Sequence, residues 1–327
     1  MNFRTEINLE KSLSTINHFD NILTIGSCFA ENIAEYFKAN RFNVFGNPFG
    51  VLYNPISIFN SLKFAVEKAE FEEKDLVFHQ SEWHSFYHHS DFSSDEKNII
   101  LKKINDGIIK TNQFLKLTDT LIITFGTSYV YKYLANGIIA SNCHKIPQKE
   151  FEYFRLTLDE TTKTIIDIIE MVEIFNPKIK IIFTVSPVRH WKNGAHNNQL
   201  SKANLLLAID EAIKSKSNCC YFPSYEIVLD DLRDYRFYNS DLVHPNKIAT
   251  DYIWEKLYNS ICSEECLKTI SEISKIVAAR NHRVRNINSV ENQKFLHVMI
   301  TKIGQLQNKY PYLNLNEDLN YFKSQII

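Results

Sequence analysis

Short apolar runs alternate along this sequence with longer segments whose apolar residues recur every three or four positions. The short runs are typical of buried strands, and the longer spacing gives a helix one apolar face. The predicted strands are Ile22–Ile25, Phe42–Phe45, Leu121–Phe125, Ile179–Val185 and Tyr221–Phe222, and the predicted helices are 29–37, 55–69, 95–117, 158–175 and 201–214. Strand, loop and helix in repeated order specify an α/β fold, with a parallel sheet and helices on both of its faces.

Two segments interrupt this order. Residues 75–91 have no clean period, so we expect them to be irregular or short-stranded and to lie at the surface. Asn136-Gly137 stands between the apolar runs 130–134 and 138–140, which predicts a β-hairpin with a type I′ turn.

Beyond Cys262 the sequence becomes helical and mixed in charge. We therefore divide the chain into an α/β domain over residues 1–261 and a helical C-terminal appendage over residues 262–327. We expect the appendage to pack on the core or on a partner, including a second copy of the chain in an oligomer.

Composition excludes several classes of function. Among 327 residues, 37 are Lys or Arg and 38 are Asp or Glu, so a net charge of -1 gives no sign of a nucleic-acid partner. No apolar run is long enough to span a bilayer, and the first residues lack the apolar region of a signal peptide, so we expect no membrane partner. The six cysteines are too sparse for a disulfide scaffold, and a cytoplasmic location is the simplest expectation.

The segment 75–91 is rich in histidine and aromatic residues. Four histidines stand there beside two acids, but their spacing matches no known set of metal ligands, so we expect no metal and no other cofactor. Trp83, Phe86 and Tyr87 have two interpretations, a surface that covers or stacks on a substrate, or ordinary partial burial.

Ser27 stands where the first strand meets the first helix. In open α/β sheets, ligands bind at the carboxyl ends of the strands, and backbone N–H groups at a helix N-terminus favour negative charge. Ser27 is therefore a candidate nucleophile, although serine is also a common helix N-cap. Cys28 is an alternative nucleophile if the helix N-terminus lowers its pKa.

A second informative segment contains Asp241 and His244. Pro245 favours an extended loop at His244, and Asn246 is placed to cap the next helix. The spacing of three lets the Asp241 carboxylate accept a hydrogen bond from one imidazole nitrogen, which leaves the other nitrogen free to act as a base. A serine hydroxyl needs such a base before it can attack.

Together these segments resemble the GSCFA family, a relative of the SGNH/GDSL hydrolases. Gly26-Ser27-Cys28-Phe29-Ala30 spells the signature that names the family, and the similarity covers roughly residues 20–255 through the blocks Asn47–Gly50, Asn142–Lys145, Thr184–His190 and Asp241–Pro245. The resemblance implies a flavodoxin-like, SGNH-hydrolase-like sheet and hydrolysis of an ester through an acyl-enzyme. It assigns Ser27 as the nucleophile, His244 as the base and Asp241 as the residue that orients His244.

The chain departs from the SGNH pattern at two places. SGNH hydrolases usually have Gly-Asp-Ser where this chain has Ile25-Gly26-Ser27, so the Asp is absent. Their Gly-x-Asn-Asp block, which supplies an oxyanion-hole asparagine, is replaced here by Gly126-Thr127-Ser128-Tyr129. The remaining candidate donors are the N–H groups of Ser27 and Gly50 and the side chains of Asn47 and Ser128.

Three further residues lie on loops that we expect near the site, namely His144, Arg189 and His190. Their two interpretations are substrate binding and structural hydrogen bonding. The predicted partner is a small-molecule or glycan ester, such as an acylated carbohydrate. The alternative from another class is a ligand-binding module without catalytic activity on the same fold.

Overall fold

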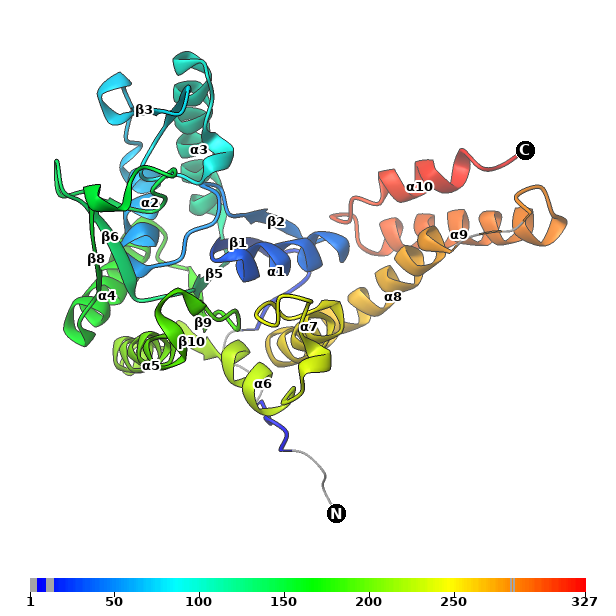
Figure 1. Cartoon of the computed structure of the whole chain (residues 1–327). Coiled ribbons are helices and arrows are strands. Elements are labelled where there is room, and N and C mark those ends of the chain that lie inside the picture. The colour runs from blue at the N-terminus through cyan, green and yellow to red at the C-terminus, as the bar shows by residue number, and fades with distance from the viewer. Residues whose placement is uncertain (1–4, 10–14, 283, 285) are drawn as a thin grey trace.

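A computed structural model of the chain describes residues 5–9, 15–282, 284 and 286–327, and Figure 1 shows its arrangement. Its central sheet has five parallel strands in the order β10-β9-β5-β1-β2. The strands are β1 (Asn21–Gly26), β2 (Asn43–Gly46), β5 (Thr120–Phe125), β9 (Lys180–Val185) and β10 (Cys219–Phe222). This order is the flavodoxin-like one, and it reverses between β1 and β5, where such sheets bind ligands. The predicted fold class is confirmed.

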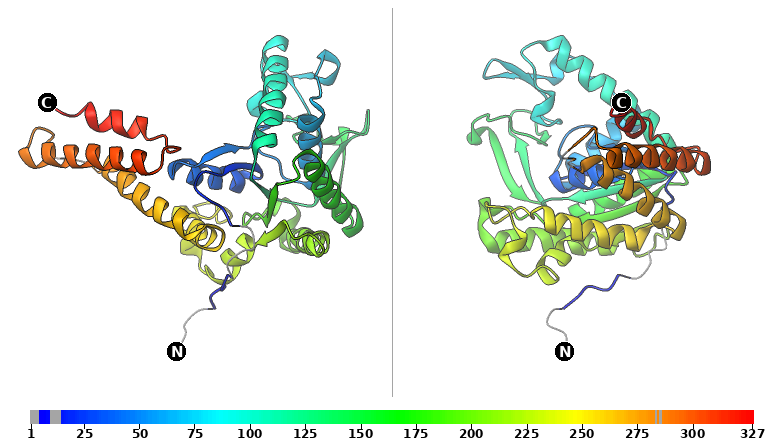
Figure 2. Two further views of the ribbon diagram at one scale, coloured as in Figure 1. Left: turned by 180° about the vertical axis from the view of Figure 1, so that it is seen from behind. Right: turned by 90° about the vertical axis from the view of Figure 1, so that its right-hand side faces the viewer.

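Helices cover both faces of this sheet, as Figures 1 and 2 show. Leu23 and Ile25 of β1 point into one core and Ile22 points into the other, because alternate side chains leave a strand on opposite sides. The first core is closed by α2 (Pro55–Glu67), α3 (Lys97–Leu117), α4 (Leu158–Phe175) and α5 (Gly194–Ile213), and the second by α1 (Cys28–Ala39), α6 (Ser224–Asp230) and α7 (Lys247–Ile261).

Two small antiparallel sheets are added to this frame. The larger has the order β7-β6-β8 and is built from β6 (Tyr129–Tyr133), β7 (Ile139–Ala140) and β8 (Phe151–Arg155). The predicted hairpin at Asn136-Gly137 is the β6–β7 connection. Its turn is not the predicted type I′, because Gly137 has a φ of +77° but the φ of Asn136 is not positive, and a type I′ turn needs a positive φ at both residues. A second hairpin, β3 (Val77–His79) with β4 (Glu82–His84), lies in the segment predicted to be irregular or short-stranded.

Three helices follow the α/β part: α8 (Glu264–Asn281), α9 (Val290–Lys309) and α10 (Asn316–Lys323). Residues of all three contribute to an apolar cluster of their own, and Figures 1 and 2 show α9 and α10 extending away from the central sheet. The buried Asp318 carboxylate anchors this appendage, because it accepts hydrogen bonds from Arg41 at 2.7 and 2.8 Å and from Arg280 at 3.0 Å. The division at residue 261 stays a prediction.

In the described part of the chain, no helix combines the length and the apolar character that crossing a membrane requires.

Candidate active site

The candidate site begins at the join between β1 and α1. Gly26 has a φ of +140°, and a Cβ there would lie 2.1 Å from the Thr124 carbonyl oxygen, so only glycine fits this approach of β1 to β5. Ser27 follows as the N-cap of α1, and its Oγ accepts a hydrogen bond from the Phe29 N–H at 3.3 Å. The Ser27 hydroxyl therefore lies at the positive end of α1 and at the reversal point of the sheet.

Asp241 and His244 form the predicted pair. The distance from His244 Nδ1 to Asp241 Oδ2 is 2.6 Å, and Asp241 Oδ1 accepts the N–H groups of Val243 and His244 at 2.9 Å each. The hydrogen bond from the His244 N–H, helped by the Val243 N–H and the imidazole, lowers the pKa of Asp241 to about 2. Because the carboxylate only accepts, Nδ1 donates and Nε2 is left as the basic nitrogen.

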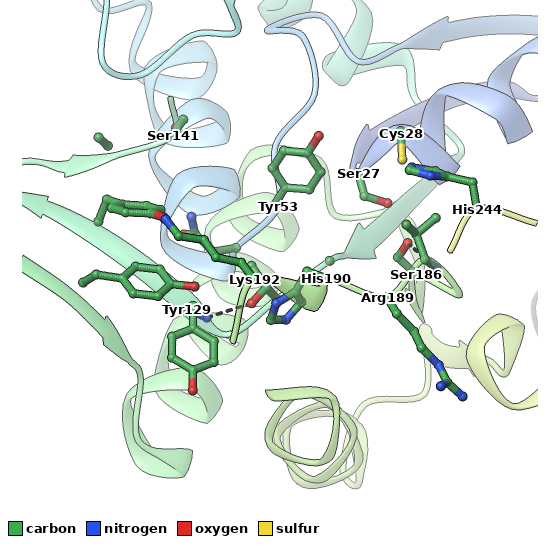
Figure 3. A pocket seen from close by; sticks show the side chains of 17 residues that line it. Ser27, Cys28, Tyr53, Tyr129, Ser141, Ser186, Arg189, His190, Lys192 and His244 are labelled. Carbon is green, nitrogen blue, oxygen red and sulfur yellow. Dashed lines mark hydrogen bonds between the residues drawn. The ribbon is translucent and has the colours of Figure 1, made fainter. Parts of the chain in front are cut away.

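Ser27 and His244 line one cavity with a volume of about 330 Å³. Figure 3 shows their side chains, with that of Cys28, at one side of this pocket. No hydrogen bond joins the Ser27 hydroxyl to the His244 imidazole in the described structure, although both residues line the same pocket. The rest of the lining is Cys28, Tyr53, Asn54, Gly126, Thr127, Tyr129, Tyr131, Ala140, Ser141, Tyr153, Ser186, Val188, Arg189, His190 and Lys192.

Cys28 also lines the pocket, although a residue at this point of a helix usually points into packing. Burial raises the pKa of its thiol, and hydrogen bonds from the Phe29 and Cys28 N–H groups only partly oppose that rise. A thiol is a nucleophile as its thiolate, so the structure gives no sign of the lowered pKa that an alternative nucleophile at Cys28 requires.

The predicted oxyanion donors differ in their availability. The Ser27 N–H donates to the Thr124 carbonyl at 3.1 Å and the Gly50 N–H to the Asn47 carbonyl at 2.8 Å, so both are engaged. Asn47 Oδ1 accepts the N–H of Gly26 at 2.9 Å, which places this amide beside the chain that carries Ser27. Its Nδ2 is buried and has no hydrogen-bond partner in the described structure. Neither Asn47 nor Gly50 lines the pocket, which corrects their expected placement. Of the predicted donors, Asn47 keeps an unpaired N–H group, but that group does not face the cavity.

The structure does not bring Ser128 and His144 to the pocket, which corrects their expected placement. Ser128 is fully buried, and its Oγ lies 3.3 Å from the Ser201 carbonyl oxygen and 3.2 Å from Ser201 Oγ. His144 is buried against His84, with ring centroids 4.5 Å apart, and its Nε2 lies 2.8 Å from the Ser85 carbonyl oxygen. Both side chains satisfy polar atoms of the surrounding structure instead of facing the cavity.

Arg189 and His190 do line the pocket, as predicted from their loop. In Figure 3 the Arg189 side chain runs away from Ser27, whereas His190 lies near Tyr129. The His190 ring meets the Tyr129 ring edge-on at 5.9 Å, and burial, with a smaller effect of the Lys202 charge, lowers the pKa of His190 to about 4. His190 is therefore neutral at pH 7.

Sequence reasoning missed a group of tyrosines on the antiparallel sheet. Tyr129, Tyr131 and Tyr153, here called the tyrosine cluster, stack with centroids 5.0 Å apart for Tyr129 and Tyr153 and 4.4 Å apart for Tyr131 and Tyr153. The Lys192 ammonium lies 4.8 and 4.9 Å from the rings of Tyr131 and Tyr153. The alternation of tyrosines at positions 129, 131 and 133 was the sequence signal that could have predicted this cluster. The aromatic residues that we considered as a substrate-covering surface, Trp83, Phe86 and Tyr87, do not line the pocket.

Lys202 was missed as well. This lysine of α5 is 1% exposed, and its Nζ donates to the carbonyl oxygens of Gly126 and Ser186. Burial lowers the pKa of Lys202 to about 7; the charge of Cys28 opposes this shift and that of Arg189 adds to it.

Among the described residues, no group of three or more His, Cys, Asp or Glu side chains is arranged to hold a metal ion.

Sequence comparison places the chain in a family. The sequence model described as the GSCFA family matches residues 21–257, and a second one, described as the GSCFA domain protein C-terminal domain, matches residues 273–327. The chain therefore belongs to the GSCFA family. No protein with a curated description matches it.

A comparison with solved structures finds a distant likeness to an acetyl xylan esterase from the rumen bacterium Butyrivibrio proteoclasticus. The sequences are 14% identical and the TM-score is 0.27. The match covers 43% of this chain and 36% of that one, so it spans about a third of that esterase. At this TM-score the likeness decides nothing about the activity of this chain.

Proposed function

We propose that this protein is a serine hydrolase that cleaves an ester of a small molecule or a carbohydrate. The observation that carries the proposal is the shared pocket, in which Ser27, at the N-terminus of α1, faces the same cavity as the Asp241–His244 pair. A hydroxyl, a basic imidazole nitrogen and a carboxylate that orients the imidazole are the three groups that acyl transfer through a serine requires.

The proposed reaction has two steps. In the first, Ser27 Oγ attacks the ester carbonyl carbon while His244 Nε2 takes the hydroxyl proton, and His244 then returns that proton to the departing alcohol. In the second, His244 takes a proton from water, the resulting hydroxide attacks the acyl-enzyme, and the carboxylic acid leaves as Ser27 regains its proton. Asp241 keeps its charge throughout and stabilises the imidazolium that forms in each step.

A hydrogen bond between Ser27 and His244 is absent before substrate binds, and this absence is compatible with the proposal. Catalytic hydrogen bonds are often long or poorly aligned in free enzymes and tighten in the substrate complex. The His244 side chain is 48% exposed and stands on the loop before α7, so a substrate that fills the cavity would also exclude water from it.

Two groups are proposed to stabilise the negative charge on the carbonyl oxygen. One is the unpaired Nδ2 of Asn47, which lies outside the pocket lining and would take the place of the missing asparagine once substrate binding turns it toward Ser27. The other is the N-terminus of α1, whose dipole favours an anion beside Ser27.

The far side of the pocket supports a carbohydrate as the substrate. Figure 3 shows Tyr129 and Lys192 on the side opposite to Ser27 and His244. Aromatic rings offer apolar faces and hydroxyl groups together, which suits a sugar ring with its alternating C–H and O–H groups. We therefore assign the tyrosine cluster to the alcohol part of an acylated carbohydrate.

The test compares wild-type protein with Ser27→Ala and Cys28→Ala on two esters, 4-nitrophenyl acetate and a per-O-acetylated xylose. We expect turnover that Ser27→Ala lowers at least about a thousandfold and that Cys28→Ala preserves. Loss of activity only in Cys28→Ala would assign the nucleophile to the thiol. No turnover of either ester, with binding of xylose to the same pocket, would favour the ligand-binding module.

A further inference from the structure

Lys202 is a buried lysine in an unusual setting, and because burial lowers its pKa to about 7, its side chain is fully charged only below that pH. Its Nζ lies 2.7 Å from the Gly126 carbonyl oxygen and 2.7 Å from that of Ser186. Distances this short suit a charged donor. No carboxylate of the described residues pairs with this ammonium, whose other close neighbour is the ring of Tyr225 at 5.4 Å.

This arrangement is costly for the fold. A buried charge without an acid partner loses hydration that two carbonyl groups only partly replace, and an apolar side chain of similar length would fill the same space. Packing alone therefore does not explain a lysine at this position.

The two carbonyl groups belong to the pocket. Gly126 directly follows β5 and Ser186 directly follows β9, so one ammonium joins the ends of two neighbouring strands of the central sheet. Both residues line the cavity that contains Ser27, whereas Lys202 does not. The ammonium therefore lies behind the pocket wall, on the side away from the cavity.

The charge of Lys202 also acts on groups in the pocket. It adds to burial in lowering the pKa of His190, and at Cys28 it opposes the rise in pKa that burial causes. Both effects have the sign expected of a positive potential in the cavity. Such a potential favours any negative charge that forms there, and in a poorly hydrated site it is weakly screened.

We propose that Lys202 is a positioning residue of this site: its ammonium fixes the loops that follow β5 and β9, and its charge stabilises the oxyanion formed when Ser27 attacks. This inference rests on the proposed ester hydrolysis. Lys202 touches the pocket wall and not the substrate, so its effect belongs to the transition state and not to ground-state binding.

The test is Lys202→Met, with Ser201→Ala as the matched control. Methionine keeps the length of the side chain and removes the charge. Ser201 is the neighbouring buried residue, and its Oγ accepts the Ser128 N–H at 2.9 Å and lies 3.0 Å from Thr127 Oγ1, so it ties the same β5 loop without a charge. We expect Lys202→Met to lower kcat roughly tenfold to a hundredfold with KM nearly unchanged. Ser201→Ala should lower kcat far less.

A second readout separates charge from structure. Phenylboronic acid forms a negatively charged tetrahedral adduct with an active serine, and Lys202→Met should weaken its inhibition by a factor similar to the loss in kcat. Equal losses of kcat in the two variants, or unchanged inhibition by the boronic acid, would overturn the proposal.

Folding is checked by thermal unfolding, and Lys202→Gln replaces Lys202→Met if the latter does not fold. If neither variant folds, Lys202 is needed for the fold itself and its proposed role in the transition state is overturned. An inactive wild-type protein would contradict the proposed function, whereas an active wild type with an equally active Lys202→Met would contradict this inference alone.

Discussion

The two sides of the pocket come from different parts of the fold. One side holds Ser27 and His244. Ser27 lies between β1 and the N-terminus of α1, and His244 lies shortly before the N-terminus of α7. The other side holds the tyrosine cluster of the antiparallel sheet, with His190 beside Tyr129 and Lys192 against the rings of Tyr131 and Tyr153. The first side holds the proposed nucleophile and base, and the second offers aromatic surface.

The contrast between two histidines shows what this division means. His244 is half exposed, and its Nδ1 lies 2.6 Å from a carboxylate oxygen of Asp241. His190 has no carboxylate partner, its Nε2 is buried without a hydrogen bond in the described structure, and its pKa is lowered by burial. We expect substitutions on the first side to change kcat and those on the second to change KM or stability.

The largest expected effect is that of Asp241→Asn. The amide cannot fix the imidazole with Nδ1 as donor, so His244 loses its orientation as a base. We expect kcat to fall roughly a hundredfold to ten-thousandfold, with KM nearly unchanged. Steady-state kinetics on 4-nitrophenyl acetate measure this, and Asp234→Asn, on a nearby exposed acid, is the control. A kcat within a factor of about two of wild type would remove Asp241 from the mechanism.

Asn47→Asp tests the amide behind the first side, which accepts the Gly26 N–H but does not line the pocket. The variant keeps an oxygen that can accept the Gly26 N–H but loses the Nδ2 donor. We expect kcat to fall about a hundredfold. A loss of kcat that appears only together with a lower unfolding temperature would show that Asn47 acts on the structure and not on the oxyanion.

On the second side, Tyr131→Leu removes one ring of the tyrosine cluster. We expect KM for an acetylated xylose to rise about fivefold, because an aromatic contact contributes roughly 1 kcal/mol, while kcat stays within about twofold. Tyr235→Leu is the control, since Tyr235 is 74% exposed and lies outside this pocket. A fall in kcat with KM unchanged would contradict the division between the two sides.

The smallest expected effect concerns His190 and pH. The folded protein keeps His190 neutral down to about pH 4, whereas in the unfolded chain histidine takes up a proton near its ordinary pKa of about 6.5. The unfolded state therefore binds more protons between these values, and stability falls as the pH drops from 7 to 5.

His190→Phe keeps the contact with Tyr129 and removes the titrating group. Because the side chain is partly exposed, the effect should stay below about 1 kcal/mol, or roughly 2–4 °C in the difference between unfolding temperatures at pH 7 and pH 5. That difference should shrink in the variant. An unchanged or larger difference would assign the pH dependence to other groups.

Sequence patterns over a few neighbouring residues predicted the parallel sheet with its helices and the side of the pocket that holds Ser27 and His244. The strand before Ser27, its N-cap position and the Asp241–His244 bond all depend on residues at most a few positions apart, and the structure confirms each of them. The helix predicted from residue 201 instead begins at Gly194, because Asn197 and Asn198 in its first turns hide its apolar period.

Such patterns could not predict in which direction a loop side chain points, or which residues distant in the sequence contact each other. Ser128 and His144 stand on loops near the site, yet Ser201 and Ser85, 73 and 59 residues away in sequence, hold their side chains out of the cavity. The strand β8 and the role of Lys202 were missed for the same reason, because both depend on partners distant in the sequence. The second side of the pocket is built from such contacts.

The most direct measurement of the central claim is covalent labelling with a fluorophosphonate probe, followed by peptide mapping of the modified residue. We expect a single label on Ser27, carried as a phosphonyl ester, which disappears in His244→Ala and persists in Cys28→Ala. Folded protein that shows no label on Ser27, or a label that His244→Ala leaves unchanged, would contradict the assignment of Ser27 and His244 as nucleophile and base.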